Sequence, residues 1–350
     1  MPDTAVTAAP TATSTATSTA TLSATSTVRT RLYRDGKLAL ENFPAAEISD
    51  HVAEDGSVVW LDLCAPTPDD FALLTEEFGL HELAVEDARH EHQRPKLDRY
   101  KDHCFLSMYA VCAAHDHEDL VIRELSVFVT ANALITVRTD DRFDMDDVVS
   151  RWDDAPELGQ FGVGFLLHGL LDHVVDGHFR AVQDMDDRIE ELEDILFDAN
   201  AKETRDIQRA SFALRKSLVR LRRMALPMRE MVNTLMRRDV HVVADPMMPY
   251  YQDVYDHVLR VTEWTESLRD MVGSIMETNL TVQGNRMNMI MKKVTSWASI
   301  VAVPTAVTGF YGQNVPYPGF GTEWGFWVST GVTIGISVAL YFGFKRRDWI

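Results

Sequence analysis

The sequence predicts an α/β cytosolic domain, then a long helical stalk, then two C-terminal transmembrane helices. Strand-like and helix-like segments alternate over residues 30–160, which is typical of an α/β unit. From Tyr250 to Val303 the chain contains no proline and only two glycines, which favours one continuous helix. Two apolar segments, 294–311 and 325–344, each approach the roughly 20 residues that a helix needs to cross a bilayer.

Residues 1–29 predict a disordered tail, because they are mostly alanine, threonine and serine. No charged residue lies between Asp3 and Arg29. A secretory signal begins with basic residues and continues into an apolar core, and this tail has neither. We therefore expect the body of the protein to stay in the cytosol.

Residues 30–160 form the predicted α/β domain, in which apolar and β-branched runs mark the strands. A proline directly after Thr67 marks a helix start, with Thr67 as the N-cap, and predicts a helix over Pro68–Phe78. The predicted strands are Ser57–Leu63, Cys104–Val111, Leu125–Val129 and Ala133–Arg138.

Residues 161–249 predict a helical part of the cytosolic body. Residues 165–197 are apolar at helical spacing and carry an acidic opposite face. Residues 204–238 predict a second amphipathic helix, which is strongly basic, and Pro227 marks a potential break within it. The two helices are expected to keep most of these charges in solvent.

The predicted stalk, 250–293, runs directly into the first span without a helix breaker. At 1.5 Å per residue, one helix from Tyr250 through Phe310 would be on the order of 80–90 Å long. Its first proline, Pro304, lies within the apolar segment, where a kink is tolerated if neighbouring groups satisfy the freed carbonyl.

Basic residues predict the orientation of the spans. Arg286, Lys292 and Lys293 precede the first span, and the last segment, 345–350, begins with Lys-Arg-Arg. The loop between the spans, 312–324, contains no lysine or arginine. The positive-inside rule then predicts a multi-pass protein of the plasma (inner) membrane, with both termini cytoplasmic and the loop outside.

One face of the first span combines small and polar side chains when it is placed on a helical wheel at about 100° per residue. Such a face lets membrane helices pack closely, or it lines a water-filled pore. Asn288 at the cytoplasmic mouth and Asn314 at the outer mouth favour the pore, which needs an oligomer because one helix cannot enclose it. The residues expected to line the pore are Asn288, Met291, Thr295, Ala298, Ala302 and Thr305.

Several short motifs follow one another along the chain: Trp60-Leu61-Asp62-Leu63, Gln93-Arg94-Pro95-Lys96, Tyr250–His257 and Tyr311-Gly312-Gln313-Asn314. Together they resemble the CorA family of magnesium channels, over residues 30 to the end. The resemblance implies a funnel-shaped homopentamer in the lipid bilayer whose first span lines the pore. It also implies that Gly312, Gln313 and Asn314 form an outer ion filter for magnesium, with cobalt and nickel as further ions.

One position departs from the family signature, which is Gly-Met-Asn: here Gln313 replaces the methionine. Zinc transporters of the ZntB type are relatives with a different middle residue, so zinc transport stays open as an alternative. Zinc-selective protein sites usually recruit histidine or cysteine, and the predicted pore face has neither.

The resemblance further implies regulatory magnesium sites between neighbouring cytosolic domains. Asp87 and Asp253 match the main carboxylate pair, and Glu86 and Asp176 are candidates for a second site. We expect bound magnesium to bridge subunits and hold the pore shut, and its loss to let the subunits splay. The alternative is that these acids are only solvated surface.

Composition excludes other classes of function. A formal charge of -19 argues against a nucleic-acid partner, which needs clustered lysine and arginine. No Walker sequence or nucleophile elbow is present, so we expect neither an enzyme nor an organic cofactor. The three cysteines lack CxxC spacing and indicate no disulfide framework. The competing class is a membrane-anchored metal sensor or scaffold that carries no ion flux.

Overall fold

The chain folds into two compact units, each made from separate stretches of sequence. The first unit runs to Ala181 and includes Leu221–Thr262, and the second comprises Val182–Arg220 and Glu263–Ile350. The computed structural model describes residues 26–90, 93–112, 120–198, 203–313 and 315–350.

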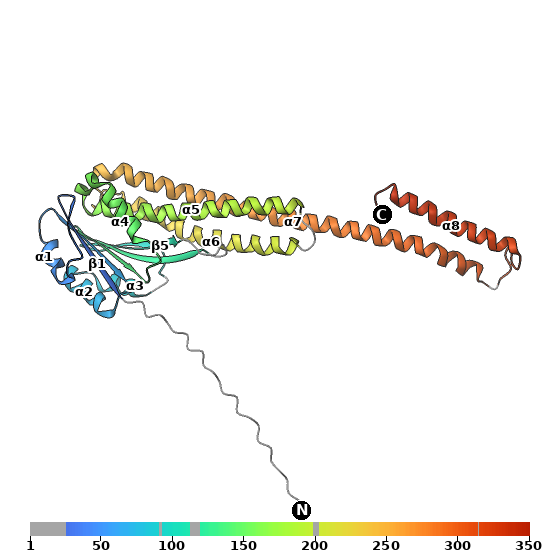
Figure 1. The fold of residues 1–350 in the computed structure, drawn as a ribbon, viewed down its shortest axis with the longest axis horizontal. Coiled ribbons are helices and arrows are strands. Elements are labelled where there is room, and N and C mark those ends of the chain that lie inside the picture. The colour runs from blue at the N-terminus through green and yellow to red at the C-terminus, as the bar shows by residue number, and fades with distance from the viewer. Residues whose placement is uncertain (1–25, 91–92, 113–119, 199–202, 314) are drawn as a thin grey trace, which may run out of the picture. The chain divides into compact units, whose positions relative to one another are not determined.

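The described part of the first unit contains a seven-stranded sheet in the order β2-β1-β3-β7-β6-β5-β4 (Figure 1). β3 and β7 are parallel, and every other neighbouring pair is antiparallel. The strands are β1 (Thr27–Arg34), β2 (Lys37–Glu41), β3 (Ser57–Cys64), β4 (Lys96–Arg99), β5 (Cys104–Cys112), β6 (Val121–Val129) and β7 (Ala133–Arg138).

The four strands predicted from sequence are confirmed, since they fall on β3, β5, β6 and β7. The predicted tail ends too late. Residues 1–25 lie outside the described residues, but Thr27 already begins β1, inside the predicted 1–29 tail. The reason is pairing with a distant strand: Thr27 lies opposite Cys64, and Val28 lies opposite Leu63.

The hairpin between β1 and β2 turns at Asp35-Gly36. Both residues have positive φ, 49° and 77°, which is the requirement of a type I′ turn. A Cβ at Gly36 would also lie 2.4 Å from the backbone nitrogen of Gln160. The turn therefore needs glycine for its backbone angle and for its close approach to the chain.

Helices cover both faces of the sheet. Alternate residues of β3 point to opposite faces, so that Trp60 joins one buried cluster and Leu61 the other. The Trp60 cluster includes Trp152 and Val258, whereas the Leu61 cluster includes Leu74. The helices are α1 (Ile48–Val52), α2 (Pro68–Phe78), α3 (Glu82–Arg89), α4 (Met145–Asp154), α5 (Val163–Asp198), α6 (Glu203–Leu235), α7 (Met248–Tyr311) and α8 (Glu323–Lys345), with 3-10 turns η1 (Ala45–Glu47), η2 (Pro156–Phe161) and η3 (Asp245–Met247).

The predicted helix Pro68–Phe78 is confirmed together with its N-cap. The Thr67 side chain accepts from the Asp70 backbone N–H, and the Asp70 carboxylate accepts from the Thr67 backbone N–H, which makes a capping box. Gly79 ends the helix at φ 63°. Local chemistry alone therefore sets both ends of α2.

A buried ion pair lies at the centre of the sheet. Arg138 donates from Nη2 to Asp62 Oδ2 at 2.9 Å, and Thr136 donates from Oγ1 to Asp62 Oδ1 at 2.7 Å. The Asp62 side chain is fully buried. Burial lowers the pKa of Arg138, but the hydrogen bond and the charge of Asp62 outweigh burial and raise it.

The three cysteines are free thiols in the first unit. Cys64 and Cys104 are buried, and Cys112 is half-buried. Burial raises the pKa of each thiol above its ordinary value. Each therefore stays protonated at neutral pH and packs as a small apolar side chain.

The two predicted amphipathic helices are confirmed as α5 and α6. The predicted break at Pro227 is wrong, because α6 continues through this residue. Met224 and Met228, on either side of the proline, are buried. Apolar packing therefore outweighs the one backbone hydrogen bond that proline removes.

The predicted stalk and first span form one helix, α7, of 64 residues, which also continues through Pro304. α7 and α8 are long and apolar enough to cross a membrane, with mean hydropathy of 1.2 and 1.5 in their most apolar windows. Only 6% of each window is buried within the chain. Few residues of either span are therefore fully buried by the rest of the chain.

Candidate functional site

The predicted ion filter begins where α7 ends. The backbone N–H of Gly312 donates to the Thr308 carbonyl at 2.8 Å, and that of Gln313 donates to the Phe310 carbonyl at 3.3 Å. A Cβ at position 312 would lie 2.9 Å from the same Thr308 oxygen, so the turn needs glycine there. The Gln313 side chain is exposed, and Asn314 lies outside the described residues.

Aromatic side chains brace this turn, which the sequence did not predict. Tyr317 donates its hydroxyl to the Tyr311 carbonyl at 2.8 Å. The Tyr317 ring lies 5.0 Å from that of Tyr311 and 5.3 Å from that of Phe320, between centroids. The end of α7 is therefore tied to the following loop by a hydrogen bond and by ring packing.

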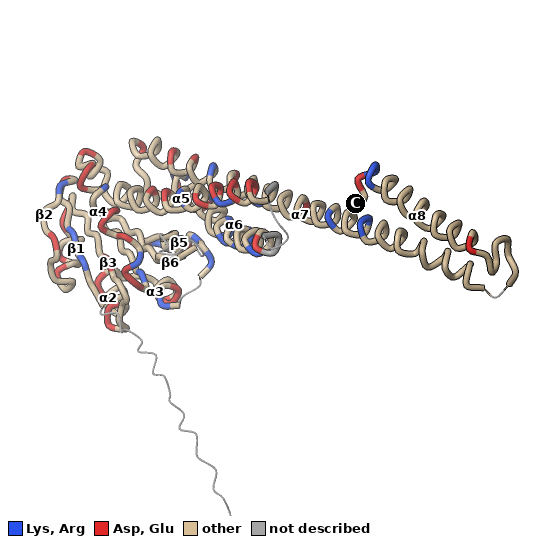
Figure 2. The backbone as a smooth tube through the Cα atoms, turned by 45° about the vertical axis from the view of Figure 1, so that its right-hand side comes forward, with Lys and Arg blue, Asp and Glu red and all other residues tan. Residues whose placement is uncertain are grey.

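The predicted pore face of α7 is exposed along its whole length. The opposite side is partly covered: Ser296 is buried, and Ile300 and Val303 are half-buried. At about 100° per residue, the covered side lies roughly 140° round the helix from the predicted pore face. Figures 1 and 2 both show α8 running back along this part of α7. The exposed residues are Asn288, Met291, Thr295, Ala298, Ala302 and Thr305.

Hydroxyl groups on this span donate hydrogen bonds to backbone carbonyls of the same helix. Ser299 donates to the Thr295 carbonyl at 2.8 Å, and Thr305 donates to the Val301 carbonyl at 3.4 Å. A hydroxyl has one proton and two lone pairs, so each oxygen keeps its capacity to accept. Such oxygens suit a hydrated cation, whose water ligands donate hydrogen bonds outward.

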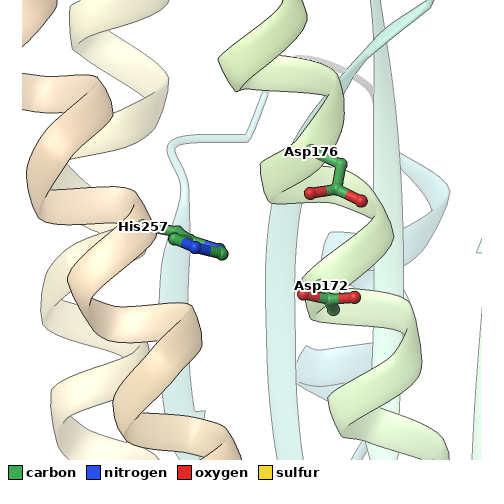
Figure 3. A group of neighbouring side chains, drawn as sticks. All are labelled: Asp172, Asp176 and His257. Carbon is green, nitrogen blue, oxygen red and sulfur yellow. The ribbon is translucent and has the colours of Figure 1, made fainter.

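A cluster of metal-ligand side chains lies in the first unit (Figure 3). Asp172 and Asp176 stand one turn apart on α5 and face His257 on α7. One ligand atom of each residue lies within 4.8 Å of the others. Carboxylate oxygens are ligands for magnesium, and an imidazole nitrogen also suits the divalent transition metals.

Arg151 forms ion pairs with both acids of this cluster. Its two terminal nitrogens lie 2.5 Å from Asp172 Oδ2 and 2.6 Å from Asp176 Oδ2. Burial lowers the pKa of Arg151, but its hydrogen bond to Asp176 and the charges of both acids outweigh burial and raise it. A metal ion at this site would therefore compete with the guanidinium for carboxylate oxygens.

Asp87, Glu86 and Asp253 are not members of this cluster, although Asp253 lies beside His257. Asp87 accepts from Lys96 Nζ at 2.8 Å, and Glu86 is exposed. Asp253 is 67% exposed, with Oδ2 3.9 Å from His257 Nδ1. Their expected partners belong to a neighbouring subunit, outside the single chain.

Of the predicted metal residues, the structure brings only Asp176 into a ligand cluster within the described residues. Asp172 and His257 were missed. The i, i+4 spacing of Asp172 and Asp176 places both on one helical face, and this signal could have found the first of them. The Arg151 contact carries no comparable sequence signal.

Comparison with known proteins places the chain in a family. The profile described as "CorA-like Mg2+ transporter protein" matches residues 55–346. The Cobalt/magnesium transport protein CorA of Thermotoga maritima is 30% identical over 284 residues, which span 79% of this chain and 78% of that protein. The Zinc transport protein ZntB of Yersinia pseudotuberculosis is 24% identical over 313 residues, 86% of this chain and 90% of that protein.

Solved structures share the fold. The complete CorA magnesium transporter from Methanocaldococcus jannaschii has a TM-score of 0.75 at 22% identity, covering 92% of this chain and 98% of that one. The full-length CmaX protein has a TM-score of 0.64 at 20% identity, covering 91% and 96%. The chain therefore belongs to the CorA family of divalent metal cation transporters, which are membrane proteins with two C-terminal transmembrane helices.

Proposed function

We propose that this chain is a magnesium channel that mediates uptake across the plasma (inner) membrane, with cobalt and nickel as further ions. It works as a homopentamer with both termini in the cytoplasm. The observation that carries the proposal is the exposed face of α7, with its small side chains and its hydroxyl oxygens, which leads to the turn at Gly312. The Thermotoga relative, named for cobalt and magnesium transport, supports the choice of ion.

The chemistry of this face suits magnesium, which loses its water reluctantly. A path lined by neutral acceptors can carry the hydrated ion without placing a carboxylate in the membrane at high cost. A divalent ion gains about 4.6 kcal/mol per 100 mV of inward-negative potential. This gain can drive uptake without hydrolysis of a nucleotide.

The outer filter is a ring of Gly312-Gln313-Asn314 segments, one from each copy. Asn314 presents its amide oxygen to the hydrated ion, and Gly312 permits the turn that follows α7. Gln313 adds a second amide near the ring, so the middle residue of the filter is where ion preference is set.

Cytosolic magnesium regulates this channel in the proposed mechanism. Asp87 of one copy and Asp253 of the next hold one ion, and Glu86 and Asp176 contribute to a second. The proximity of Asp172 and His257 to Asp176 supports a ligand set larger than a single carboxylate there. Bound magnesium bridges the copies and holds the pore shut, and its loss lets the like-charged carboxylates repel.

Zinc transport is the second candidate function. It is favoured by the similarity to the Yersinia ZntB protein and by Gln313 in place of methionine. The described pore face offers no histidine or cysteine, which supports magnesium instead.

Flux into liposomes that contain the purified full-length protein tests these proposals. We expect entry of magnesium, and also of cobalt and nickel, driven by an inward-negative potential without a proton gradient. Asn314→Ala should reduce magnesium entry at least tenfold, whereas Gln183→Ala, at an exposed amide on α5, should leave it unchanged. Zinc entry that depends on a proton gradient, without magnesium entry, would establish the second candidate. Absence of flux for every ion would indicate that the protein is a membrane-anchored sensor or scaffold.

A further inference from the structure

The C-terminal end of α8 is an ordered, hydrogen-bonded turn rather than a frayed helix end. The Trp349 N–H donates to the Phe344 carbonyl at 3.0 Å, and the Asp348 N–H donates to the Lys345 carbonyl at 3.3 Å. Asp348 has φ 51°, and the Trp349 ring stacks on Phe344 at 5.6 Å between centroids and 11° between planes. This is a Schellman motif with its apolar contact, so the last carbonyls of the helix are satisfied by the backbone.

Three consecutive cations, at positions 345–347, stand at the end of α8 and in the turn that follows it. Lys345 and Arg346 line an open hollow of about 490 Å³ together with Phe342. Phe342 lies three and four residues before them, which is the spacing that places side chains on one face of a helix. Arg347 is exposed and does not line the hollow.

None of the three cations forms an ion pair within the part of the chain that the structure describes. Lys345 Nζ lies 5.9 Å from the centroid of the Tyr341 ring, which is its one ring contact there. Cations near a helix C-terminus can serve to neutralise the terminal carbonyls, but the Schellman hydrogen bonds already satisfy these groups. The charges are therefore available to an external anion.

We infer that the hollow of Phe342, Lys345 and Arg346 binds the phosphate of an anionic phospholipid. Arg346 offers a planar fork of N–H donors to phosphate oxygens, and Lys345 offers a point charge. Phe342 continues into the exposed apolar surface of α8, so it receives the start of the acyl chains. Trp349, held on Phe344, lies at the level where amphipathic rings favour the membrane interface.

The surroundings of the hollow favour a lipid over another phosphate. α8 is a span with only 6% of its apolar window buried, so the hollow opens directly beside a surface that faces hydrocarbon. A soluble phosphate would use the two charges but leave Phe342 without a partner. Figure 2 shows basic residues on both α7 and α8 near the C-terminus. Residues 345–348 contain three basic residues and one acid, Asp348, so basic residues predominate at this end of α8.

Native mass spectrometry of the full-length protein in detergent, titrated with phosphatidylglycerol or phosphatidylcholine, tests the inference. We expect phosphatidylglycerol to bind at least tenfold more tightly than phosphatidylcholine, and glycerol phosphate alone not to compete. Lys345→Gln and Arg346→Gln should each weaken phosphatidylglycerol binding about fivefold. Arg347→Gln removes the same charge one residue away, outside the hollow, and should change it less than twofold.

Equal effects of Arg346→Gln and Arg347→Gln would overturn the inference, because they would indicate diffuse attraction to a charged surface. Equal affinity for the two lipids, or displacement by glycerol phosphate, would overturn it as well. Binding is read without ion flux, so the result is independent of whether the protein proves to transport magnesium. An unchanged melting temperature of each variant in phosphatidylcholine shows that the fold is intact.

Discussion

The sheet of the first unit and the two spans of the second unit differ in how much of their structure one chain completes. Every residue of β7 is buried, and the charged groups Asp62 and Arg138 at the centre of the sheet satisfy one another. Only 6% of the most apolar window of each span is buried, and the predicted pore face of α7 is exposed among the described residues. The sheet is therefore completed by contacts within one chain, whereas the spans leave most of their residues exposed to a membrane or to other partners.

The largest expected effect comes from breaking the buried ion pair between Asp62 and Arg138 at the centre of the sheet. Asp62→Asn leaves Arg138 as a buried charge without its counter-ion, which typically costs about 3–5 kcal/mol. We expect the melting temperature of the full-length protein in detergent to fall by on the order of 10 °C. Glu54→Gln, which breaks an exposed pair with Arg34, should leave the melting temperature unchanged. A small shift in Asp62→Asn would show that the core does not depend on this pair.

The next effect separates the two regions by function rather than by stability. Gly312→Ala places a Cβ 2.9 Å from the Thr308 carbonyl oxygen and forces the turn after α7 to move. We expect ion flux in liposomes to fall about tenfold, with the melting temperature of the sheet unit unchanged. Gly273→Ala, within α7 and with open space around it, is the control and should retain flux. Normal flux in Gly312→Ala would mean that this turn does not form part of the ion path.

A smaller effect is expected at the acid cluster of the first unit. Arg151→Gln removes the cation that is paired with Asp172 and Asp176, so magnesium should bind there several-fold more tightly. The measurement is the magnesium concentration that gives half-maximal protection of the full-length protein from protease. Arg180→Gln, at an exposed position of α5, should not change it. Weaker protection in Arg151→Gln would indicate that the three charges serve only the fold.

The smallest effect concerns acid stability of the sheet unit. His103 is buried, its Nε2 has no hydrogen-bond partner among the described residues, and burial, with a smaller effect from His81, lowers its pKa below 6.5. The unfolded chain then binds more protons than the folded one, so stability is full above about pH 6.5 and is lost as pH falls toward the folded pKa. We expect His103→Asn to flatten the decline of melting temperature between pH 7 and pH 5. An unchanged slope would assign the decline to other groups.

Local chemistry made much of the fold predictable from sequence. Thr67, Pro68 and Gly79 mark the ends of α2 without help from the rest of the molecule. The strands rich in β-branched residues were also found, because their side chains are buried on both faces. β1 was missed as a strand because it pairs with β3, which is distant in the sequence, and β2 was missed because all of its residues are exposed. Pro227 was misread because the packing of its neighbours keeps α6 continuous.

The candidate site was predictable in part. The spans follow from length and hydropathy, and Gly312 follows from its motif and has a steric reason in the structure. The meeting of Asp172 with His257, and of both acids with Arg151, depends on the packing of three helices and has no local signal. The role of Tyr317 was missed for the same reason, since its hydroxyl reaches back to the end of α7.

The buried thiols of the first unit have a practical consequence for mapping the spans. Maleimides and methanethiosulfonates react with thiolate, and the raised pKa values of Cys64, Cys104 and Cys112 keep these groups protonated and slow to react. A single cysteine introduced on α7 can then be labelled while the three native cysteines react only slowly. Water accessibility along the helix could be recorded position by position, with the natural cysteines left in place.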